Sequence, residues 1–469
     1  MIPFLISCAT TTYKAKMASY YHKVQTGHFQ SAKASLEENS FIQQKRNQLL
    51  YYFEKGKLYH LTKQYDSSNL YLNNADILIE QTRKNAGDIA AANLINPMMQ
   101  TYLGEDFEPF MMHYYKALNY LYLGKIENAV VEARRIQLTT QTQNDKFAGK
   151  LTRYSKDAFA LNLQGIIYEI NGDINNAFIA YRNAVELYLS NNGSYYNVQM
   201  PKQLKRDVIK TALQMGFTGE ATKYKNLFSI DSIAASNTNE LIVFVEQGWI
   251  AEKKQRNLFV TRDNAGISSL FFIDSDGSRV QVPFDVNAYR ELRSSDITAS
   301  SFRILKVSIP FYSINSEYQK VNVVINNTNY ATEITQNLNS LAVNILQERM
   351  FKEIGNAVVR QITKKLAEKG IEAGTKAVVE NNSKEKDDKK KKENAEAAGA
   401  VAGLLVNILN TATEKADTRN WQSLPAFISY VRIPLQTGEN KLTLQFGNQQ
   451  KNITIQSTQK LQVYNWVIN

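Results

Sequence analysis

The stretch from residue 96 to residue 135 holds the side chains best suited to recognising a charged partner. Its polar residues include two adjacent carboxylates, a histidine, a tyrosine and two adjacent arginines. An arginine guanidinium presents a planar fork of N–H donors that fits a carboxylate or an anionic glycan. The same acids and arginines could instead pair with one another and only pin the chain in place. The candidate partner-binding residues are Tyr102, Glu105, Asp106, His113, Arg134 and Arg135.

Catalytic motifs are absent from the sequence. None of the four histidines lies in an HExxH motif, and the chain has no GxxxxGK[ST], GxGxxG or GxSxG motif. Glu105 and Asp106 are neighbours, so on a helix they would point in different directions and would not form an acid–base pair by themselves. We therefore predict no catalytic residue, no metal site, no cofactor and no enzymatic activity.

The single cysteine, Cys8, has the chemistry of a lipid attachment point. It follows Leu-Ile-Ser, a pattern that resembles the bacterial lipobox, in which the cysteine thiol is acylated. Only MIPFLIS precedes it, which is short for a signal peptide, so we expect the natural start to lie upstream and residues 1–8 to be its remnant. The other interpretation is a plain N-terminal cysteine that behaves as a small hydrophobic residue.

Internal repeats follow the cysteine, with the residue spacing of tetratricopeptide (TPR) repeats, which are pairs of antiparallel helices. Small residues in such a pair let the two helices approach closely, and aromatic residues fill the space between them. The repeats are more widely spaced than the regular period of about 34 residues, and the extra residues fall at 77–109 and 137–157. The positions predicted to pack between the helices are Gly56, Tyr59, Ala75, Ala117, Tyr120, Ala129, Gly165, Tyr168, Ala177 and Ala184.

The C-terminal half changes from helical to alternating patterns of apolar residues. ELIVFVEQG, SFRILKVSIPFY and AFISYVRIPL predict strands, and SSLFFIDSDGSRVQVPF predicts a hairpin that turns at Asp276–Gly277. A two-helix insertion is predicted at 336–415, with a flexible charged segment at 380–394.

These patterns predict an α+β multidomain protein. An all-α, TPR-like helical repeat array at 9–231 is followed by a linker at 232–239 and a β-rich domain at 240–469. Because a repeat stack is held by contacts between neighbouring repeats, we also predict that residues 9–230 fold alone. A partner is expected on the face of the third repeat and its insert, since inserts in an array often form the binding face.

Composition narrows the classes of function. The chain is 43% hydrophobic with only 8 prolines and 21 glycines, which argues against disorder. Its net charge of +11 is spread over both halves, which is a weak footprint for nucleic acid, so no nucleic-acid partner is predicted. No run of about 18 apolar residues, the length that indicates a transmembrane helix, occurs in the sequence.

Three stretches together resemble a family of bacterial TPR-containing lipoproteins of unassigned function. They are NPMMQTYLGEDFEPFMMHYYKALNYLYLGKIENAVVEARR, NELIVFVEQGWIAEKK and ADTRNWQSLPAFISYVRIPLQTGENKLTL. The resemblance implies a cell-envelope location, and Ala9 after the cysteine implies sorting to the outer membrane, facing the periplasm. It supplies no reaction.

The expected function is that of a lipid-anchored periplasmic scaffold. Its repeat groove would bind other envelope proteins, among them peptidoglycan-associated machinery, in cell-wall or outer-membrane maintenance. The alternative is an envelope hydrolase or ligand-processing enzyme with its site in the C-terminal β domain. A deep pocket lined by several titratable groups in that domain would favour the enzyme, whereas a groove on the repeats would favour the scaffold.

Overall fold

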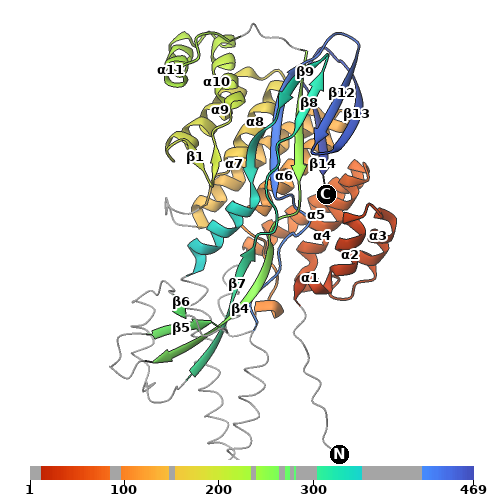
Figure 1. Ribbon diagram of the computed structural model, residues 1–469, viewed down its shortest axis with the longest axis vertical. Coiled ribbons are helices and arrows are strands. Elements are labelled where there is room, and N and C mark those ends of the chain that lie inside the picture. Colours follow the sequence, from red (N-terminus) through yellow and green to blue (C-terminus); the bar gives the residue numbers. More distant parts are fainter. Residues whose placement is uncertain are drawn as a thin grey trace, which may run out of the picture.

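The computed structural model describes residues 12–84, 97–146, 154–233, 239–262, 270–274, 279–280, 304–350 and 415–468. Helices make up the N-terminal half and β-sheets the C-terminal part, so the predicted α+β class is confirmed. The helices line up along one side of the molecule, and two sheets cover them from the other side (Figure 1).

The longer helices of this half pack as consecutive pairs. A short helix α1 (Tyr13–Lys16) comes before them, and the 3-10 turns η1 (Lys45–Asn47) and η3 (Pro97–Met99) lie between them. The pairs are α2 (Ala18–Gln25) with α3 (Phe29–Glu37), α4 (Gln48–Leu61) with α5 (Tyr65–Lys84), α6 (Glu108–Tyr122) with α7 (Ile126–Lys146), α8 (Ala158–Ile170) with α9 (Ile174–Leu189), and α10 (Lys202–Gln214) with α11 (Thr218–Phe228).

The turns inside these pairs share one backbone geometry. The second residue after the first helix is left-handed in each, at Gly27, Lys63, Gly124, Gly172 and Gly216, with φ between 59° and 78°. The next residue then donates its N–H to the carbonyl five positions back at 2.8–2.9 Å, which closes the helix end. Each pair therefore makes the same reversal of chain direction.

Long helices account for part of the extra residues between the predicted repeats. Helix α5 continues to Lys84, and helix α7 continues to Lys146. Residues 77–84 and 137–146 are thus helix rather than inserted loop. Of the rest of the first predicted insert, the structure describes residues 97–107, which lead into α6.

Close approach of paired helices depends on two glycines without a side chain. A Cβ atom on Gly165 in α8 would lie 2.4 Å from Cε1 of Tyr181 in α9, and one on Gly56 in α4 would lie 2.5 Å from Cδ2 of Leu72 in α5. The other predicted packing positions are buried, apart from the half-buried Tyr120. They are Tyr59, Ala75, Ala117, Ala129, Tyr168, Ala177 and Ala184.

Replacing Gly165 by alanine is expected to lower the free energy of unfolding by about 1–3 kcal/mol, because the added methyl group overpacks the interface. The ring of Tyr181 is fully buried and its hydroxyl donates to Glu169 at 2.9 Å, so it has little freedom to move aside. Gly219 in α11 is the matched control. Nothing lies within 4 Å of its added Cβ, so Gly219→Ala should stabilise by about 0.4–1 kcal/mol. Denaturant unfolding measures both, and equal effects of the two variants would contradict the prediction.

The strands of the C-terminal part form sheets of four strands. The central sheet has the order β10-β11-β3-β14, in which β14 is parallel to β3 and the other neighbours are antiparallel. The outer sheet has the order β13-β12-β8-β9. The strands of these two sheets are β3 (Glu240–Gln247), β8 (Asn322–Ile325), β9 (Thr328–Ala331), β10 (Glu333–Asn337), β11 (Phe427–Pro434), β12 (Glu439–Phe446), β13 (Gln449–Gln456) and β14 (Gln462–Ile468).

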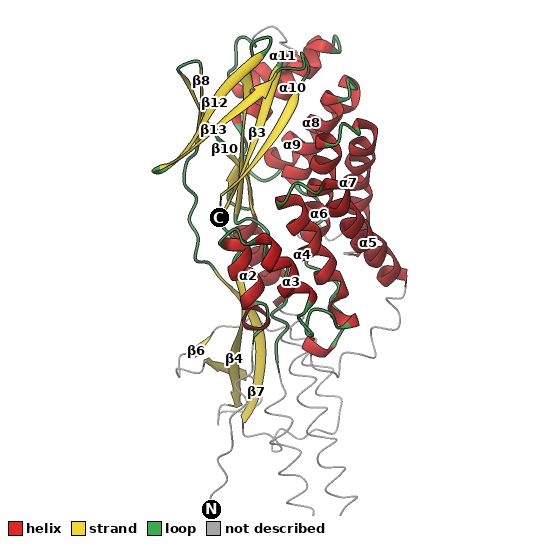
Figure 2. Ribbon diagram, turned by 90° about the vertical axis from the view of Figure 1, so that its right-hand side faces the viewer, coloured by secondary structure: helices red, strands yellow, loops and turns green. Residues whose placement is uncertain are grey.

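Strand β3 is buried on both faces, as its continuous apolar run predicts. Ile242 and Phe244 point into the core that the sheet shares with the helices. Leu241, Val243 and Val245 belong to a second core, which the central sheet shares with the outer sheet. The molecule therefore has the layers helices, central sheet and outer sheet, which Figure 2 shows from the side.

A third sheet extends beyond the end of the helical layer (Figure 1). Its order is β6-β5-β4-β7, from β4 (Glu252–Arg262), β5 (Leu270–Asp274), β6 (Arg279–Val280) and β7 (Ile304–Ser313). The antiparallel pairing of β5 with β6 agrees with the predicted hairpin, while its turn at Asp276–Gly277 lies outside the described residues. A two-stranded hairpin of β1 (Ser194–Tyr195) and β2 (Val198–Gln199) joins α9 to α10.

Strand β10 runs to Asn337, so the insertion predicted from residue 336 begins as strand, and residues 338–350 are helical. The charged segment at 380–394, the second predicted helix, and Cys8 with the rest of residues 1–8 lie outside the described residues.

One hydrophobic core joins the two halves of the chain. It includes Phe53 and Tyr114 of the helices together with Phe244, Trp421 and Tyr430 of the C-terminal part. Even the first helix is tied to the far end of the chain, since Tyr13 donates its backbone N–H to Thr418 Oγ1 at 3.3 Å. None of the described helices is both long and apolar enough to cross a membrane.

Candidate functional site

A groove of about 420 Å³ lies between α5, α6 and α7, beside the loop that leads into α6. Its lining mixes apolar side chains, such as Ile79 and Met112, with charged ones. Most of the lining comes from helices that contact one another, α5 with α6 and α6 with α7, so these walls are rigid elements, while Leu103, Glu105 and Asp106 come from the loop.

Four of the six sequence-predicted binding residues line this groove, namely Glu105, Asp106, His113 and Arg135. Tyr102 and Arg134 are not part of the lining. Tyr102 is only 5% exposed, and its hydroxyl donates to both carboxylate oxygens of Glu108 at 2.7 and 2.8 Å. Arg134 is exposed on α7.

Glu105 is held by cations from distant parts of the chain. Lys253 and Arg349 each place a nitrogen 2.5 Å from one of its oxygens. Burial alone would raise the pKa of Glu105, but the charges of Arg349 and Lys253 outweigh it and lower the pKa to about 2. The carboxylate is therefore ionised and already neutralised from within the protein.

The pKa of Glu108, three residues further on, is shifted in the opposite direction. Burial and the charge of Glu105 raise the pKa of Glu108 to about 8. Its oxygens accept the backbone N–H of Trp421 at 2.6 Å and that of Glu105 at 3.0 Å. This side chain thus anchors the loop before α6 to the C-terminal part.

Asp106 completes the internal pairing of the loop. Its carboxylate lies 2.5 Å from Nζ of Lys146, and its backbone carbonyl accepts a hydrogen bond from Gln143 at 3.2 Å. Both partners belong to the last turns of α7. The acids that the sequence offered for partner recognition therefore hold the loop against the helices.

A second cluster at the groove contains three groups of the kind that bind metal ions. Asp76, His113 and Glu132 are buried, and one potential ligand atom of each lies within 4.8 Å of the others. The ammonium of Lys116 sits among them, 2.7 Å from Asp76 and 3.0 Å from Glu132. His113 Nδ1 lies 2.8 Å from Glu132 Oε2.

Arg135 adds a second positive charge to this cluster, 2.8 Å from Asp76. Two carboxylates thus face two permanent cations, and the ammonium of Lys116 occupies the space in which a metal ion would bind. This arrangement favours a structural network that joins α5, α6 and α7.

Exposed leucines give the groove its apolar character. Leu103 is 49% exposed and Leu138 is 61% exposed, and both are lining residues. Leu103 lies in the loop before α6 and Leu138 on α7, and together they form an apolar patch in one hollow, which is the kind of surface that marks a contact site. The sequence does carry a signal for Leu138, because it lies off the buried face of α7 that Ala129, Ala133 and Ile136 form.

The three stretches that carry the family resemblance meet in space. Arg419 donates to the carbonyls of Pro97 and Gln100 at 2.9 Å, and it forms an ion pair with Asp417 at 2.7 Å. Trp421 stacks on Phe53, with ring centroids 4.3 Å apart and planes 3° from parallel. Lys253 of the middle stretch reaches Glu105 of the first. These residues thus hold the helices and the sheets together.

A buried ion pair makes a second junction between the halves. Lys57 in α4 forms an ion pair with Glu246 in β3, and both side chains are almost completely buried. The same carboxylate accepts hydrogen bonds from Tyr114 at 3.2 Å and Tyr115 at 2.8 Å. Burial alone would raise the pKa of Glu246, but the charge of Lys57 outweighs it and the pKa is lowered.

Arg432 in β11 makes the third junction. Its guanidinium contacts three carboxylates, Glu169 at 2.6 Å, Glu240 at 2.6 Å and Asp207 at 3.0 Å. They come from α8, β3 and α10, and Lys210 adds a further cation 2.5 Å from Glu169. Burial alone would raise the pKa of Glu169, but the hydrogen bonds and charge of Arg432 lower it to about 2.

Comparison with known proteins found no matching family model and no matching curated protein. Among solved structures, part of the chain is similar to the crystal structure of the apo form of RapI. That match has 12% sequence identity and a TM-score of 0.33, and it covers 47% of this chain and 55% of the RapI chain.

Proposed function

We propose that this protein is a non-enzymatic scaffold that binds other proteins through its helical layer. The helix pairs are then TPR-like repeats, an assignment supported by the shared geometry of their turns and by the close approach of the pairs at Gly56 and Gly165. Such arrays commonly present extended binding surfaces to protein partners.

The groove between α5, α6 and α7 is the proposed binding surface. The observation that carries this proposal is the pair of exposed leucines, Leu103 and Leu138, on a hollow with rigid walls. The buried charged residues around them, such as Glu105 and Asp106, are neutralised internally, so a partner would dock mainly through apolar contacts. Arg134, exposed on the same helix as Leu138, remains available at the rim for an acidic group.

The proposed location is the periplasmic face of the outer membrane, with a lipid on Cys8 as the anchor. The lipobox-like residues before Cys8 and the family resemblance support this location. The partners would then be envelope proteins, including those that build or remodel peptidoglycan.

The alternative is an enzyme with a site in the β-rich part, for which the buried titratable pair Lys57 and Glu246 is one candidate. The cavity beside the titratable pair Lys57 and Glu246 has a volume of about 10 Å³. That is about the space of one water molecule, which is too small for a substrate.

The test compares Leu103→Glu/Leu138→Glu with the wild type in co-purification from detergent-solubilised envelopes. Introducing two charges into the groove should remove the partner, while the melting temperature stays within a few degrees because both leucines are half exposed. The matched control is Leu213→Glu/Leu227→Glu, which changes leucines of 42% and 50% exposure on α10 and α11. Partner retention by the groove variant, or equal loss in both variants, would refute the groove as the binding surface.

A further inference from the structure

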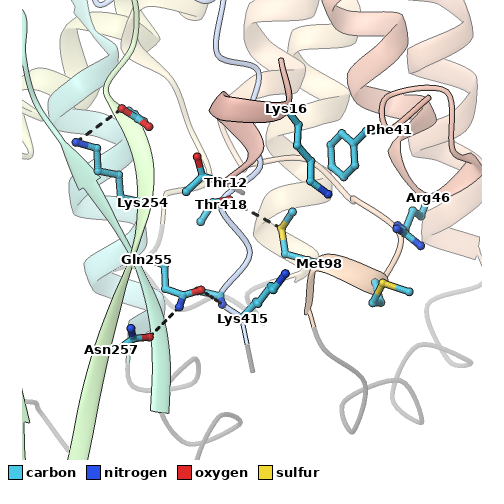
Figure 3. Close-up of a pocket in the computed structure, with 13 residues that line it drawn as sticks. Thr12, Lys16, Phe41, Arg46, Met98, Lys254, Gln255, Asn257, Lys415 and Thr418 are labelled. Carbon is cyan, nitrogen blue, oxygen red and sulfur yellow. Dashed lines mark hydrogen bonds and ion pairs between the residues drawn. The ribbon is translucent and has the colours of Figure 1, made fainter. Parts of the chain in front are cut away.

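A second pocket, away from the groove, lies where the helical layer meets the strands of the third sheet (Figure 3). Its volume is about 390 Å³. Thr12 and Lys16 come from the N-terminal segment, Arg46 from η1, and Met98 and Met99 from η3. Strand β4 and the residues 415–418 close the other side.

The lining of this pocket is strongly basic. Four cations, Lys16, Arg46, Lys254 and Lys415, face a single carboxylate, Glu252. That carboxylate is already engaged, because Lys14 lies 3.0 Å from it and Lys254 lies 3.7 Å from it.

The other three cations form no ion pair with any described residue. The ammonium of Lys16 lies over the ring of Phe41, 4.2 Å from its centroid. The Nε of Arg46 is buried without a hydrogen-bond partner. Lys16 and Lys415 lie around the same space beside Met98 (Figure 3).

These positive charges repel one another across the pocket. Burial, together with the charges of Lys415 and Arg46, lowers the pKa of Lys16. A bound anion would remove this repulsion, and the guanidinium of Arg46 would offer it charged N–H donors.

We propose that this pocket binds a phosphate monoester. Three unneutralised cations call for more than one negative charge, which a phosphate monoester carries near pH 7 and a carboxylate does not. An arginine fork with ammonium groups beside it is the combination that suits phosphate oxygens. Phe41, Met98 and Met99 give the organic part of the ligand an apolar surface.

The phosphate could come from a soluble ester or from the headgroup of an anionic lipid, since both present the same chemistry. Thr12 at the pocket follows Cys8 by four positions in the sequence. A lipid on Cys8 would therefore favour the membrane source, but the pocket itself does not depend on the scaffold function or on acylation.

The experiment uses the full chain with two probes. Glycerol 3-phosphate, titrated by calorimetry, represents the soluble source. Phosphatidylcholine vesicles with and without phosphatidic acid, in a sedimentation assay, represent the membrane source. The pocket variant is Lys16→Gln/Arg46→Gln, and the matched control is Lys45→Gln/Lys202→Gln, which removes two exposed cations outside the pocket.

The wild type and the control should bind at least one probe, and the pocket variant should bind it at least about tenfold more weakly for each lost cation. Binding of glycerol 3-phosphate indicates a soluble ligand, and binding of phosphatidic acid vesicles alone indicates the lipid headgroup. Lys415→Gln, which leaves the helical segments untouched, repeats the measurement if the double variant is unstable. Failure of the wild type to bind either probe, or equal weakening in pocket and control variants, would overturn the proposal.

Discussion

The Arg432→Met variant is expected to lose about 3–5 kcal/mol of its free energy of unfolding. Methionine fills a similar volume but leaves Glu169, Asp207 and Glu240 without the guanidinium that neutralises them. These carboxylates are largely buried, so water replaces the lost interaction poorly. Breaking a buried ion pair by removing one partner costs this much because a charge is left behind in a medium of low polarity.

The effect of Arg432→Met should depend on pH in a defined direction. The pKa of Glu169 in the folded wild type is about 2, below the value of 4.5 for an unperturbed glutamate. Its stabilisation is therefore present above pH 4.5 and is lost as the pH falls toward 2. Without the arginine, Lys210 is left as the cation beside Glu169, so burial is opposed less strongly and the pKa of Glu169 rises from its wild-type value. The variant should therefore lose less stability in acid than the wild type does. The difference in stability between the two proteins should be largest above about pH 5 and should narrow below it.

Denaturant unfolding at several pH values tests this prediction. Lys441→Met is the matched control, since Lys441 is 81% exposed and lies 3.5 Å from the exposed Glu439; it should change stability by less than about 0.5 kcal/mol. Adding Glu169→Gln and Asp207→Asn to Arg432→Met should restore part of the loss. A loss of less than about 1 kcal/mol, or a difference that does not vary with pH, would show that the cluster is not neutralised in this way.

The second large effect concerns the helical half on its own. The repeat pattern predicts that residues 9–230 fold alone, but the shared core leads to the opposite expectation for this fragment. Cutting the chain there removes Phe244, Trp421 and Tyr430 from the core. Truncating one buried aromatic residue costs about 3–5 kcal/mol, so the loss of three matches or exceeds the about 5–15 kcal/mol that stabilise a typical domain.

We therefore expect residues 9–230 to retain helical circular dichroism but to melt without a cooperative transition, and to associate through the surface that the central sheet normally covers. The full-length chain is the control and should melt cooperatively. Far-UV circular dichroism and size-exclusion chromatography make the comparison. A monomeric fragment with a sharp transition would instead establish that the helix pairs support one another without the sheet.

Local patterns predicted most of the secondary structure but few of the contacts that join the helices to the strands. The apolar run of β3 marks a buried strand, and four glycines mark turns between the two helices of a pair, because these signals depend on neighbouring residues. Arg432 sits in a strand whose sequence gives no sign of its three carboxylate partners. Those partners lie 192 to 263 positions away, and only the folded chain brings them together.

The candidate groove shows the same division between local and long-range information. Its predicted residues, such as Glu105 and Arg135, share a site because Glu105 lies in the loop before α6 and Arg135 lies on α7, which packs against α6. The sequence could not show that Glu105 is neutralised by Lys253 and Arg349, so it overstated the role of the acids in recognition. The wall that Asp76 and Ile79 of α5 contribute was not predicted, because the predicted insert at 77–109 begins beside Asp76.

The hydrogen bond between Tyr13 and Thr418 can form only late in biosynthesis. The two residues are 405 positions apart, and a ribosome adds about 5–20 residues per second, so the first helix waits roughly 20–80 seconds for its partner. The central sheet is delayed further, because β14 ends at Ile468 and pairs with β3. From the synthesis of Phe228 until that of Ile468, the described helices of the N-terminal half are complete while their sheet-facing surface is bare. The yield of native protein in the cell therefore depends on how well that surface is shielded until the last strand is made.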